Sequence, residues 1–283
     1  NVGRSRSHNE DAVVAQPPVF AVADGLGGHE AGEVASDIAI QKLIATAPKK
    51  PDRGALDRAV RAANHAVLKA VESGKGKSGM GTTMTAAVIG EGRIVLAQVG
   101  DSRAYLLRRS RLMQVTEDHS IVAAMVRSGS LTPEQAQKHP QRNVITRALG
   151  TEAGMPVDTY EYEALRGDRW LLCSDGLTAM VPNSRIEEIL CAEPTPALAA
   201  ERLIQAANDA GGLDNISVIV IDITEEYSPK SGSGRGARWW LGVLAWVSAV
   251  AAILYLAGWG VTSYANSRAF LQVEPSGNVA IYR

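Results

Sequence analysis

Short apolar runs rich in valine and isoleucine recur along residues 1–225 and are separated by polar turns. Runs of this length, bounded by glycine and charged residues, are typical of buried β-strands. Several follow one another through short turns, such as GEGR at 90–93 and GDSR at 100–103, and such turns indicate antiparallel pairing. The predicted strands are 19–23, 83–89, 93–99, 104–107, 170–173 and 216–221.

Helical patterns occupy segments of their own. Apolar residues recur at three- and four-residue intervals from Leu56 to Val71, which predicts an amphipathic helix. The segment Thr132–Gln135 is a capping box with proline in the first turn. Thr195–Pro196 opens a further helix that Gly211–Gly212 closes. Strands and helices in separate blocks predict an α+β fold rather than a doubly wound parallel sheet.

The pattern changes near the C-terminus, where no charged residue lies between Arg238 and Arg268. A membrane-spanning helix needs about 20 apolar residues. Four of the five tryptophans fall in this stretch, and tryptophan is enriched where such helices meet the membrane surface. A buried core helix of this length is unusual, so residues 239–262 are predicted to span a membrane.

The flanks of this span suggest its orientation. Basic residues gather before it in the Gly/Ser-rich segment 226–238, which is typical of a flexible linker. An excess of positive charge marks the cytoplasmic side, so we expect residues 1–225 in the cytoplasm. Residues 263–283 then form a short extracytoplasmic tail, and the protein is expected in the inner or plasma membrane as a single-pass protein.

Composition excludes several classes of protein. The net charge is −1 and 46% of the residues are hydrophobic, which argues against a basic nucleic-acid binder and against a disordered chain. Two cysteines are too few for a disulfide-stapled secreted scaffold. Both Cys173 and Cys191 are expected to be small buried hydrophobic residues.

Aspartates recur at the ends of the predicted strands. Three strands end in an aspartate followed by a small residue, at Asp24–Gly25, Asp101–Ser102 and Asp175–Gly176, while Asp11 and Asp214 directly precede apolar runs. An ordinary turn explains any one of these pairs alone. Together they place carboxylates along one rim of a sheet, where mutual repulsion calls for a neutralising cation. Ligands that are all oxygen favour Mg²⁺ or Mn²⁺.

Eight segments stand out in this order along the chain: RSHNEDA (6–12), ADGLGGHEAGEVAS (23–36), GMGTTMTAAVI (79–89), VGDSRAYLLR (99–108), TEDHS (116–120), NVITRALG (143–150), LLCSDGL (171–177) and DNISVIVI (214–221). Together they resemble the metal-dependent protein serine/threonine phosphatases of the PPM (type-2C) family, in particular its bacterial members. The resemblance extends to about residue 224 and implies a four-layer α-β-β-α sandwich of two antiparallel sheets flanked by helices. The family's opening strand is expected to be truncated before Asn1.

The resemblance implies a site for two Mn²⁺ or Mg²⁺ ions and a candidate site for a third. Asp24 would bridge the two ions, and the backbone carbonyl of Gly25 would ligate one of them. The remaining implied ligands are Asp175 and Asp214 for the second ion, Glu10 and Asp11 mainly through water, and Asp118 together with Asp175 for the third.

The implied reaction is hydrolysis of phosphoserine and phosphothreonine in proteins, by attack of a metal-bridging hydroxide on phosphorus. Arg6 would bind the substrate phosphate, because a guanidinium suits a phosphate dianion, and Arg6, Asp24 and Asp175 are the expected catalytic residues. The general acid is not identified: Leu26 stands where many eukaryotic members place histidine, and His29 follows three residues later. Phosphorylated Ser/Thr proteins and a cognate kinase are the expected partners, with no nucleic acid.

Three alternatives stay open. The chain could be a catalytically silent, membrane-tethered protein that binds phosphoproteins, although the presence of Arg6 and of the implied metal ligands favours an active enzyme. Asp118 could cap a helix starting near His119 rather than bind a third ion. Asp101 is expected to position the turn before Arg103 rather than to bind metal.

Overall fold

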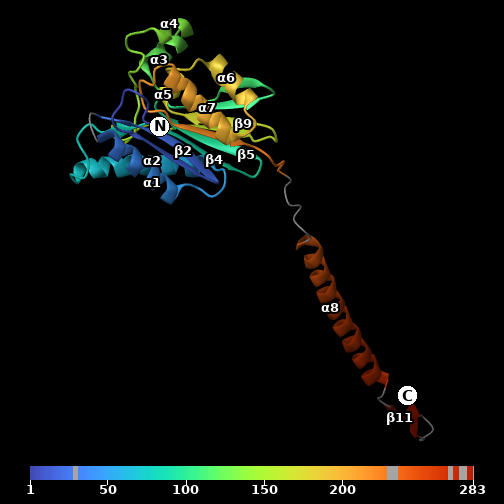
Figure 1. Ribbon diagram of the computed structural model, residues 1–283. Coiled ribbons are helices and arrows are strands. Elements are labelled where there is room, and N and C mark those ends of the chain that lie inside the picture. The colour runs from blue at the N-terminus through green and yellow to red at the C-terminus, as the bar shows by residue number, and fades with distance from the viewer. Residues whose placement is uncertain (28–30, 228–234, 267–269, 274–278, 283) are drawn as a thin grey trace. The chain divides into compact units, whose positions relative to one another are not determined.

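The structure, a computed structural model, describes residues 1–27, 31–227, 235–266, 270–273 and 279–282. The chain divides into two compact units, Asn1–Ser228 and Pro229–Arg283. The first contains two antiparallel sheets and the helices that cover them (Figure 1). The second contains one long helix and a small hairpin.

The first sheet has the strand order β1-β2-β4-β5-β8, with β3 paired to β2. Strand β5, between β4 and β8, is buried along almost its whole length because both of its faces are covered, and this explains its apolar run at residues 94–97. Every pairing in the sheet is antiparallel. The strands are β1 (Asp11–Gln16), β2 (Val19–Leu26), β3 (Gly81–Thr82), β4 (Met84–Gly90), β5 (Arg93–Val99) and β8 (Asp158–Glu163).

The second sheet has the order β10-β9-β6-β7 and is also antiparallel throughout. Its inner face packs against the first sheet through large side chains such as Leu106 and Trp170, which meet Phe20 and Leu96 of the first sheet in one core cluster. The strands are β6 (Arg103–Arg108), β7 (Arg111–Gln114), β9 (Arg169–Cys173) and β10 (Val218–Asp222).

Two helix pairs cover the outer faces of the sheets. Alternate side chains of β2 point to opposite faces of the first sheet. Ala21 and Ala23 pack toward α1 and α2, while Phe20 and Val22 face the second sheet. The second sheet packs against α6 and α7 through a third cluster. The result is the expected four-layer α-β-β-α sandwich, with α1 (Ala31–Thr46), α2 (Arg53–Glu72), α6 (Asn183–Ala192) and α7 (Pro196–Asp209) outermost.

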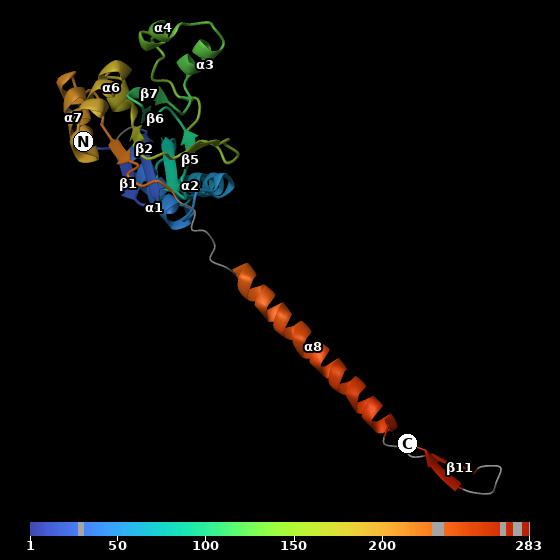
Figure 2. The ribbon, with the colours of Figure 1, turned by 90° about the vertical axis from the view of Figure 1, so that its right-hand side faces the viewer.

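Two short helices, α3 (Ile121–Arg127) and α4 (Pro133–Gln137), lie outside the four layers (Figure 2). Neither has a buried residue, so local interactions hold them. The expected capping box is present at α4, where Thr132 and Gln135 exchange side-chain and backbone hydrogen bonds. A further short helix, α5 (Asp175–Thr178), follows β9 directly.

The strands predicted from apolar runs are confirmed with small shifts at their ends, whereas β1, the two-residue β3 and two polar edge strands were missed. β8 has the sequence DTYEYE and β7 is largely exposed, so neither carries an apolar run. Helix α1 was also missed, because alanine and glycine form much of its buried face. Small side chains there give weak helical periodicity.

The second unit contains α8 (Arg235–Asn266), which extends beyond the predicted span at both ends. Within it, Gly242–Tyr264 is long and apolar enough to cross a membrane. Strands β11 (Phe270–Val273) and β12 (Val279–Tyr282) pair antiparallel, so the described part of the expected tail contains a hairpin.

Candidate functional site

A cavity of about 160 Å³ lies at the sheet ends where most of the predicted site residues gather. It draws residues from the N-terminal segment, from both sheets and from the segment that follows α4. The residues lining it are Arg6, Glu10, Asp24, Gly25, Leu26, Asp101, Asn143, Ile145, Asp175, Asp214 and Asn215. Six of these were expected to bind metal or phosphate from the sequence, namely Arg6, Glu10, Asp24, Gly25, Asp175 and Asp214.

The first pair of carboxylates is fixed by the pairing of β1 with β2, in which Asp11 lies opposite Asp24. Close packing explains the glycine that follows Asp24. A Cβ atom on Gly25 would lie 2.3 Å from the carbonyl oxygen of Gly32 and 2.5 Å from that of Glu10. Only glycine therefore lets β2 approach the start of α1 and the N-terminal segment at this point.

The second pair comes from β9 and β10. Because these strands are antiparallel, with Cys173 opposite Val218, the residues just after β9 and just before β10 lie at the same end. This brings Asp175 and Asp214 to the cavity. The glycine after Asp175 again allows a close approach, because a Cβ atom on Gly176 would lie 2.0 Å from the carbonyl oxygen of Asn215.

A further carboxylate comes from Asp101, in the turn that carries the chain from β5 of the first sheet to β6 of the second. The sequence placed this residue among the carboxylates of the rim but assigned it to the turn rather than to metal binding; in the structure it lines the cavity. Its signal was the same strand-then-aspartate pattern that marks Asp24 and Asp175. The site thus lies on the seam between the two sheets.

Burial and mutual repulsion favour the protonated forms of these carboxyl groups. Burial, and then the charges of Asp11 and Asp175, raise the pKa of Asp24 well above its ordinary value. Burial and the charge of Asp175 raise the pKa of Asp101 to about 7. The pKa of Asp175 is raised as well, by burial and by the charge of Asp214.

Asp11, which lies opposite Asp24, is the carboxylate of this group that most needs a compensating positive charge. Both of its carboxylate oxygens are buried without a hydrogen-bond partner. Burial raises the pKa of Asp11 to about 6. The nearby hydroxyls of Ser217 and Ser174 partly offset this rise, although neither makes a hydrogen bond of ordinary geometry with the carboxylate. Buried carboxylates with unsatisfied oxygens suit a hard divalent cation.

The same residues leave room for water in a coordination shell. Among the described residues, no three Asp, Glu, His or Cys side chains are grouped closely enough to enclose an ion by themselves. Carboxylates, the Gly25 carbonyl and water are all oxygen donors. The donor set therefore fits Mn²⁺ or Mg²⁺, because Mg²⁺ in particular keeps several waters when it binds protein.

Arg6 provides the positive charge that lines the cavity. Its guanidinium donates to a carboxylate oxygen of Asp214 at 2.9 Å and is half exposed. The hydrogen bond and charge of Asp214 raise the pKa of Arg6, and Glu10 and Asp24 act in the same direction. An exposed guanidinium at the mouth of a carboxylate cluster can receive an anion such as phosphate.

Asn215 holds the N-terminal segment against the cavity and was not foreseen as a site residue. Its side-chain amide donates to the carbonyls of His8 at 2.9 Å and Val2 at 3.1 Å, and its oxygen accepts from the backbone N–H of Glu10 at 2.8 Å. These bonds bridge more than 200 residues of sequence. They fix Arg6 and Glu10 beside Asp214.

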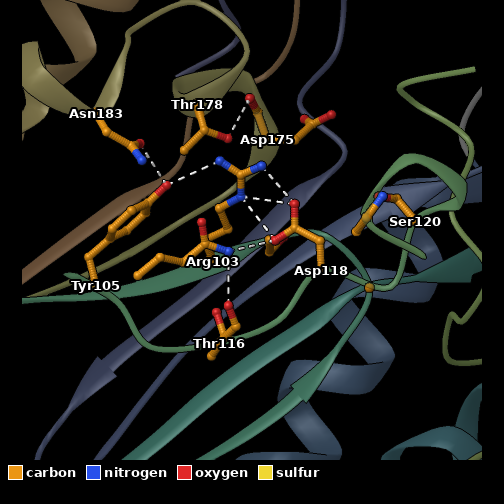
Figure 3. Close-up of polar contacts among 12 residues, drawn as sticks. Arg103, Tyr105, Thr116, Asp118, Ser120, Asp175, Thr178 and Asn183 are labelled. Atoms are coloured by element: carbon orange, nitrogen blue, oxygen red, sulfur yellow. Dashed lines mark hydrogen bonds and ion pairs between the residues drawn. The ribbon is translucent and has the colours of Figure 1, made fainter. Parts of the chain in front are cut away.

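Asp118 lies apart from the cavity lining. Its two oxygens accept three hydrogen bonds from the Arg103 guanidinium at 2.7–3.0 Å, and the same guanidinium reaches the Tyr105 hydroxyl (Figure 3). Helix α3 is capped by Ser120, so the alternative role of Asp118 as a helix cap was wrong. Asp101 lies in the turn before Arg103, as expected, but the Arg103 guanidinium is held by Asp118.

Two residues of the cavity wall, Asn143 and Ile145, come from the segment after α4. Both belong to the segment NVITRALG (143–150) that carries part of the resemblance, but neither was expected as a site residue. The segment returns to the body of the fold through a bridge between Ser120 and Ile145. His29 lies outside the described residues.

The two cysteines differ from each other. Cys173 is fully buried in β9, and burial raises the pKa of its thiol to about 12. Cys191 is exposed, so the expectation that it is buried was wrong. It lies on α6, whose buried residues are Ile186, Ile189 and Leu190, and Cys191 falls on the outward face.

Comparison with known sequences gives one family. A model of that family, described as protein phosphatase 2C, matches residues 3–207. The serine/threonine phosphatase stp of Listeria innocua is 40% identical over 233 residues, which cover 78% of this chain and 92% of the Listeria protein. The serine/threonine protein phosphatase PstP of Mycobacterium tuberculosis is 45% identical over 226 residues, covering 79% of this chain and 44% of PstP.

Solved structures agree with this result. The crystal structure of the Mycobacterium tuberculosis phosphatase PstP/Ppp superposes with a TM-score of 0.75 at 44% identity, covering 80% of this chain and 96% of that one. The catalytic domain of PstP in complex with two manganese ions superposes with a TM-score of 0.73 at 42% identity, again covering 80% and 96%.

Proposed function

Because the chain belongs to the protein phosphatase 2C family, we propose that the carboxylate cavity is its active site and acts on phosphoserine and phosphothreonine in proteins. The chain is a metal-dependent serine/threonine phosphatase, as its relatives are, and uses two Mn²⁺ or Mg²⁺ ions. The observation that carries the active-site assignment is the buried, unpaired carboxylate of Asp11, close to Asp24 and to other aspartates whose pKa values are raised.

The proposed ligands are the oxygen atoms that reach this cavity. Asp24, Asp175, Asp214 and the carbonyl of Gly25 would bind the ions directly, while Glu10 and Asp11 would act through water. When bound, the ions lower the pKa of a water molecule so that it can attack phosphorus, and they neutralise the phosphoryl oxygens.

A third ion is also proposed. Its place in the cavity fits Asp101 and Asp175 better than Asp118, because both oxygens of Asp118 are occupied by Arg103. Asp118 would need to release the guanidinium before it could bind an ion.

The side chains of the site have separate tasks in this proposal. Arg6 binds the substrate phosphate and exchanges its ion pair with Asp214 for the phosphate oxygens. Asn215 keeps Arg6 at the mouth by holding the segment on either side of it. No histidine is among the described residues that line the cavity, so we propose that water in the cavity protonates the departing serine or threonine oxygen.

The test is the substitution Asp24→Asn in the whole chain. It removes a negatively charged ligand without changing the size of the side chain, so hydrolysis of p-nitrophenyl phosphate and of a phosphothreonine peptide with Mn²⁺ should fall more than about 100-fold. The matched control is Asp209→Asn, which breaks an exposed ion pair with Arg4 and should leave the rate unchanged.

The alternative, a silent phosphoprotein-binding protein, makes a different forecast. In that case the unmodified chain would bind the phosphothreonine peptide with Mn²⁺ present but release no phosphate. Near-normal turnover by Asp24→Asn would instead place the active site elsewhere.

We also propose that the chain is anchored in a membrane by α8, with residues 1–225 on the cytoplasmic side, 226–238 as a linker and the residues after the span on the far side. Gly242–Tyr264 has a mean hydropathy of 1.8, and its most apolar stretch is not buried. A buried core helix would be covered by protein, and a signal sequence would lie near the N-terminus. An uncovered apolar helix at the other end of the chain suits lipid.

A further inference from the structure

The turn that carries Asp101 is held by buried polar side chains that have no part in the proposed chemistry. The amide of Gln98 donates to the carbonyls of Gly100 at 3.0 Å and Ser102 at 2.7 Å. The hydroxyl of Ser102 lies 2.8 Å from that of Thr83, which also accepts the backbone N–H of Asp24 at 2.9 Å. Gln98, Ser102 and Thr83 are all fully buried.

Only glycine fits at position 100 of this turn. Its φ is +98°, and a Cβ atom there would lie 2.5 Å from the Thr83 methyl group. The backbone of the turn is therefore packed against Thr83, the residue between β3 and β4. The direction in which Asp101 enters the cavity depends on the hydrogen bonds that fix this one residue and its neighbours.

His119 makes two of those bonds and is itself buried, with 3% of its surface exposed. Its Nδ1 accepts the backbone N–H of Gly100 at 3.2 Å, and its own backbone N–H donates to the Gly100 carbonyl at 2.9 Å. Since Nδ1 is an acceptor, the ring proton is on Nε2, which lies 3.0 Å from a carboxylate oxygen of Asp158. Burial lowers the pKa of His119, which keeps the ring neutral.

The same residue contacts a second segment of the cavity lining. The carbonyl of His119 accepts the backbone N–H of Thr146 at 2.7 Å, and Arg147 shares the Asp158 carboxylate with the imidazole. Thr146 directly follows Ile145, which lines the cavity together with Asn143. One buried histidine thus contacts both the turn of Asp101 and the segment that carries Asn143 and Ile145.

We infer that His119 is a positioning residue of the active site, which sets Asp101 and the Asn143–Ile145 wall in a fixed relation through Gly100 and Thr146. It touches neither substrate nor metal. The inference rests on the proposed function to the extent that Asp101 must face a bound ion. Residues that orient metal ligands in this way commonly affect affinity for the metal 10- to 100-fold when altered.

Two substitutions separate the two nitrogens of the ring. His119→Asn places an acceptor oxygen where Nδ1 was and removes the donor to Asp158. His119→Gln places a donor where Nε2 was and removes the acceptor for Gly100. The control is His65→Gln, which changes an exposed histidine on α2.

The measurement is the Mn²⁺ concentration that gives half of the maximal rise in melting temperature of the whole chain. We expect His119→Gln to need about tenfold more Mn²⁺ than the unmodified chain. His119→Asn and His65→Gln should need no more than about threefold more Mn²⁺, which is less than the loss of a residue that orients a metal ligand usually causes. The KM for a phosphothreonine peptide should likewise rise most for His119→Gln, because the segment that carries Asn143 and Ile145 would also shift.

Equal Mn²⁺ requirements for His119→Gln and the unmodified chain would overturn the inference. So would a larger effect of His119→Asn than of His119→Gln, because contact with Asp158 would then be the important one. If His119→Gln does not fold, Gln98→Asn withdraws the side-chain donor to the Gly100 and Ser102 carbonyls of the same turn and should give the same increase. Failure of the unmodified chain to bind Mn²⁺ or to release phosphate would instead count against the proposed function.

Discussion

At the scale of single residues, the aspartates of the cavity make the metal-free protein bind protons near neutral pH. Asp101 has a pKa of about 7 and Asp11 a pKa of about 6, both above the ordinary value of 3.8. A raised pKa in the folded state means that folding is favoured when the group is protonated. The resulting stability is complete below the ordinary pKa and is lost as the pH rises through about 6 and 7.

The metal-free chain should therefore become more stable as the pH falls from 8 to 5. The free energy of unfolding should change by up to about 1.4 kcal/mol per pH unit for each carboxyl that titrates. Urea unfolding in a chelator at several pH values measures this slope. Saturating Mn²⁺ should reverse it, because the metal binds the ionised carboxylates; a metal-free protein that instead loses stability between pH 8 and 5 would contradict the assignment.

For single residues, the sequence predicted the kind of site, a carboxylate metal site, better than it predicted which aspartates line it. The Asp-Gly pairs at Asp24 and Asp175 were recognisable because the close approach of backbones there admits only glycine. Asp101 was expected to stay outside the metal site, yet it lines the cavity, whereas Asp118, expected to cap a helix or bind a third ion, holds Arg103. Which of them faces the cavity depends on where the Arg103 side chain points, and that is settled by packing between β6 and the loop before α3 rather than by local sequence.

At the scale of elements, the pair Arg103–Asp118 ties β6 to the loop that leads into α3. Asp118→Asn should weaken it and leave a largely buried guanidinium poorly paired, at a cost of about 2 kcal/mol in the free energy of unfolding. Urea unfolding without metal measures the loss. Glu117→Gln is the control, because its ion pair with Arg127 is longer and exposed.

The same variant separates two roles for Asp118. If Asp118 only holds Arg103, its Mn²⁺ requirement should stay close to that of the unmodified chain once the loss of stability is taken into account. A raised Mn²⁺ requirement with unchanged stability would instead favour Asp118 as a ligand of a third ion.

Burial explains which elements were predictable. Strands such as β5 and β9 are covered on both faces, and a strand covered in this way must be apolar along its length. β8 lies at a sheet edge, where alternate residues meet water, so its charged sequence gives no such signal. The segment containing α3 and α4 has no buried residue in either helix, so its contribution to the cavity wall could not be inferred from hydrophobicity.

At the scale of the whole molecule, the proposed anchor predicts where each end of the chain lies. A reporter that works only outside the cytoplasm should be active when fused after Arg283, and a reporter that works only inside the cytoplasm should be active when fused before Asn1. The chain should remain with the membrane after washing with salt and carbonate, whereas residues 1–228, which form a compact unit, should be released. A cytoplasmic signal from the fusion after Arg283 would refute the orientation.

The hydrogen bonds from Asn215 to the N-terminal segment affect when, during its synthesis, the chain can become active. Arg6 reaches its place only when Asp214 and Asn215 have left the ribosome, which is about 10–40 s after Arg6 itself at ordinary rates of translation. Until then the growing chain lacks both a phosphate-binding arginine in position and one of its proposed metal ligands. With the proposed site, we expect the nascent chain to be inert toward phosphoproteins near the ribosome until the last strand of the catalytic unit has been synthesised.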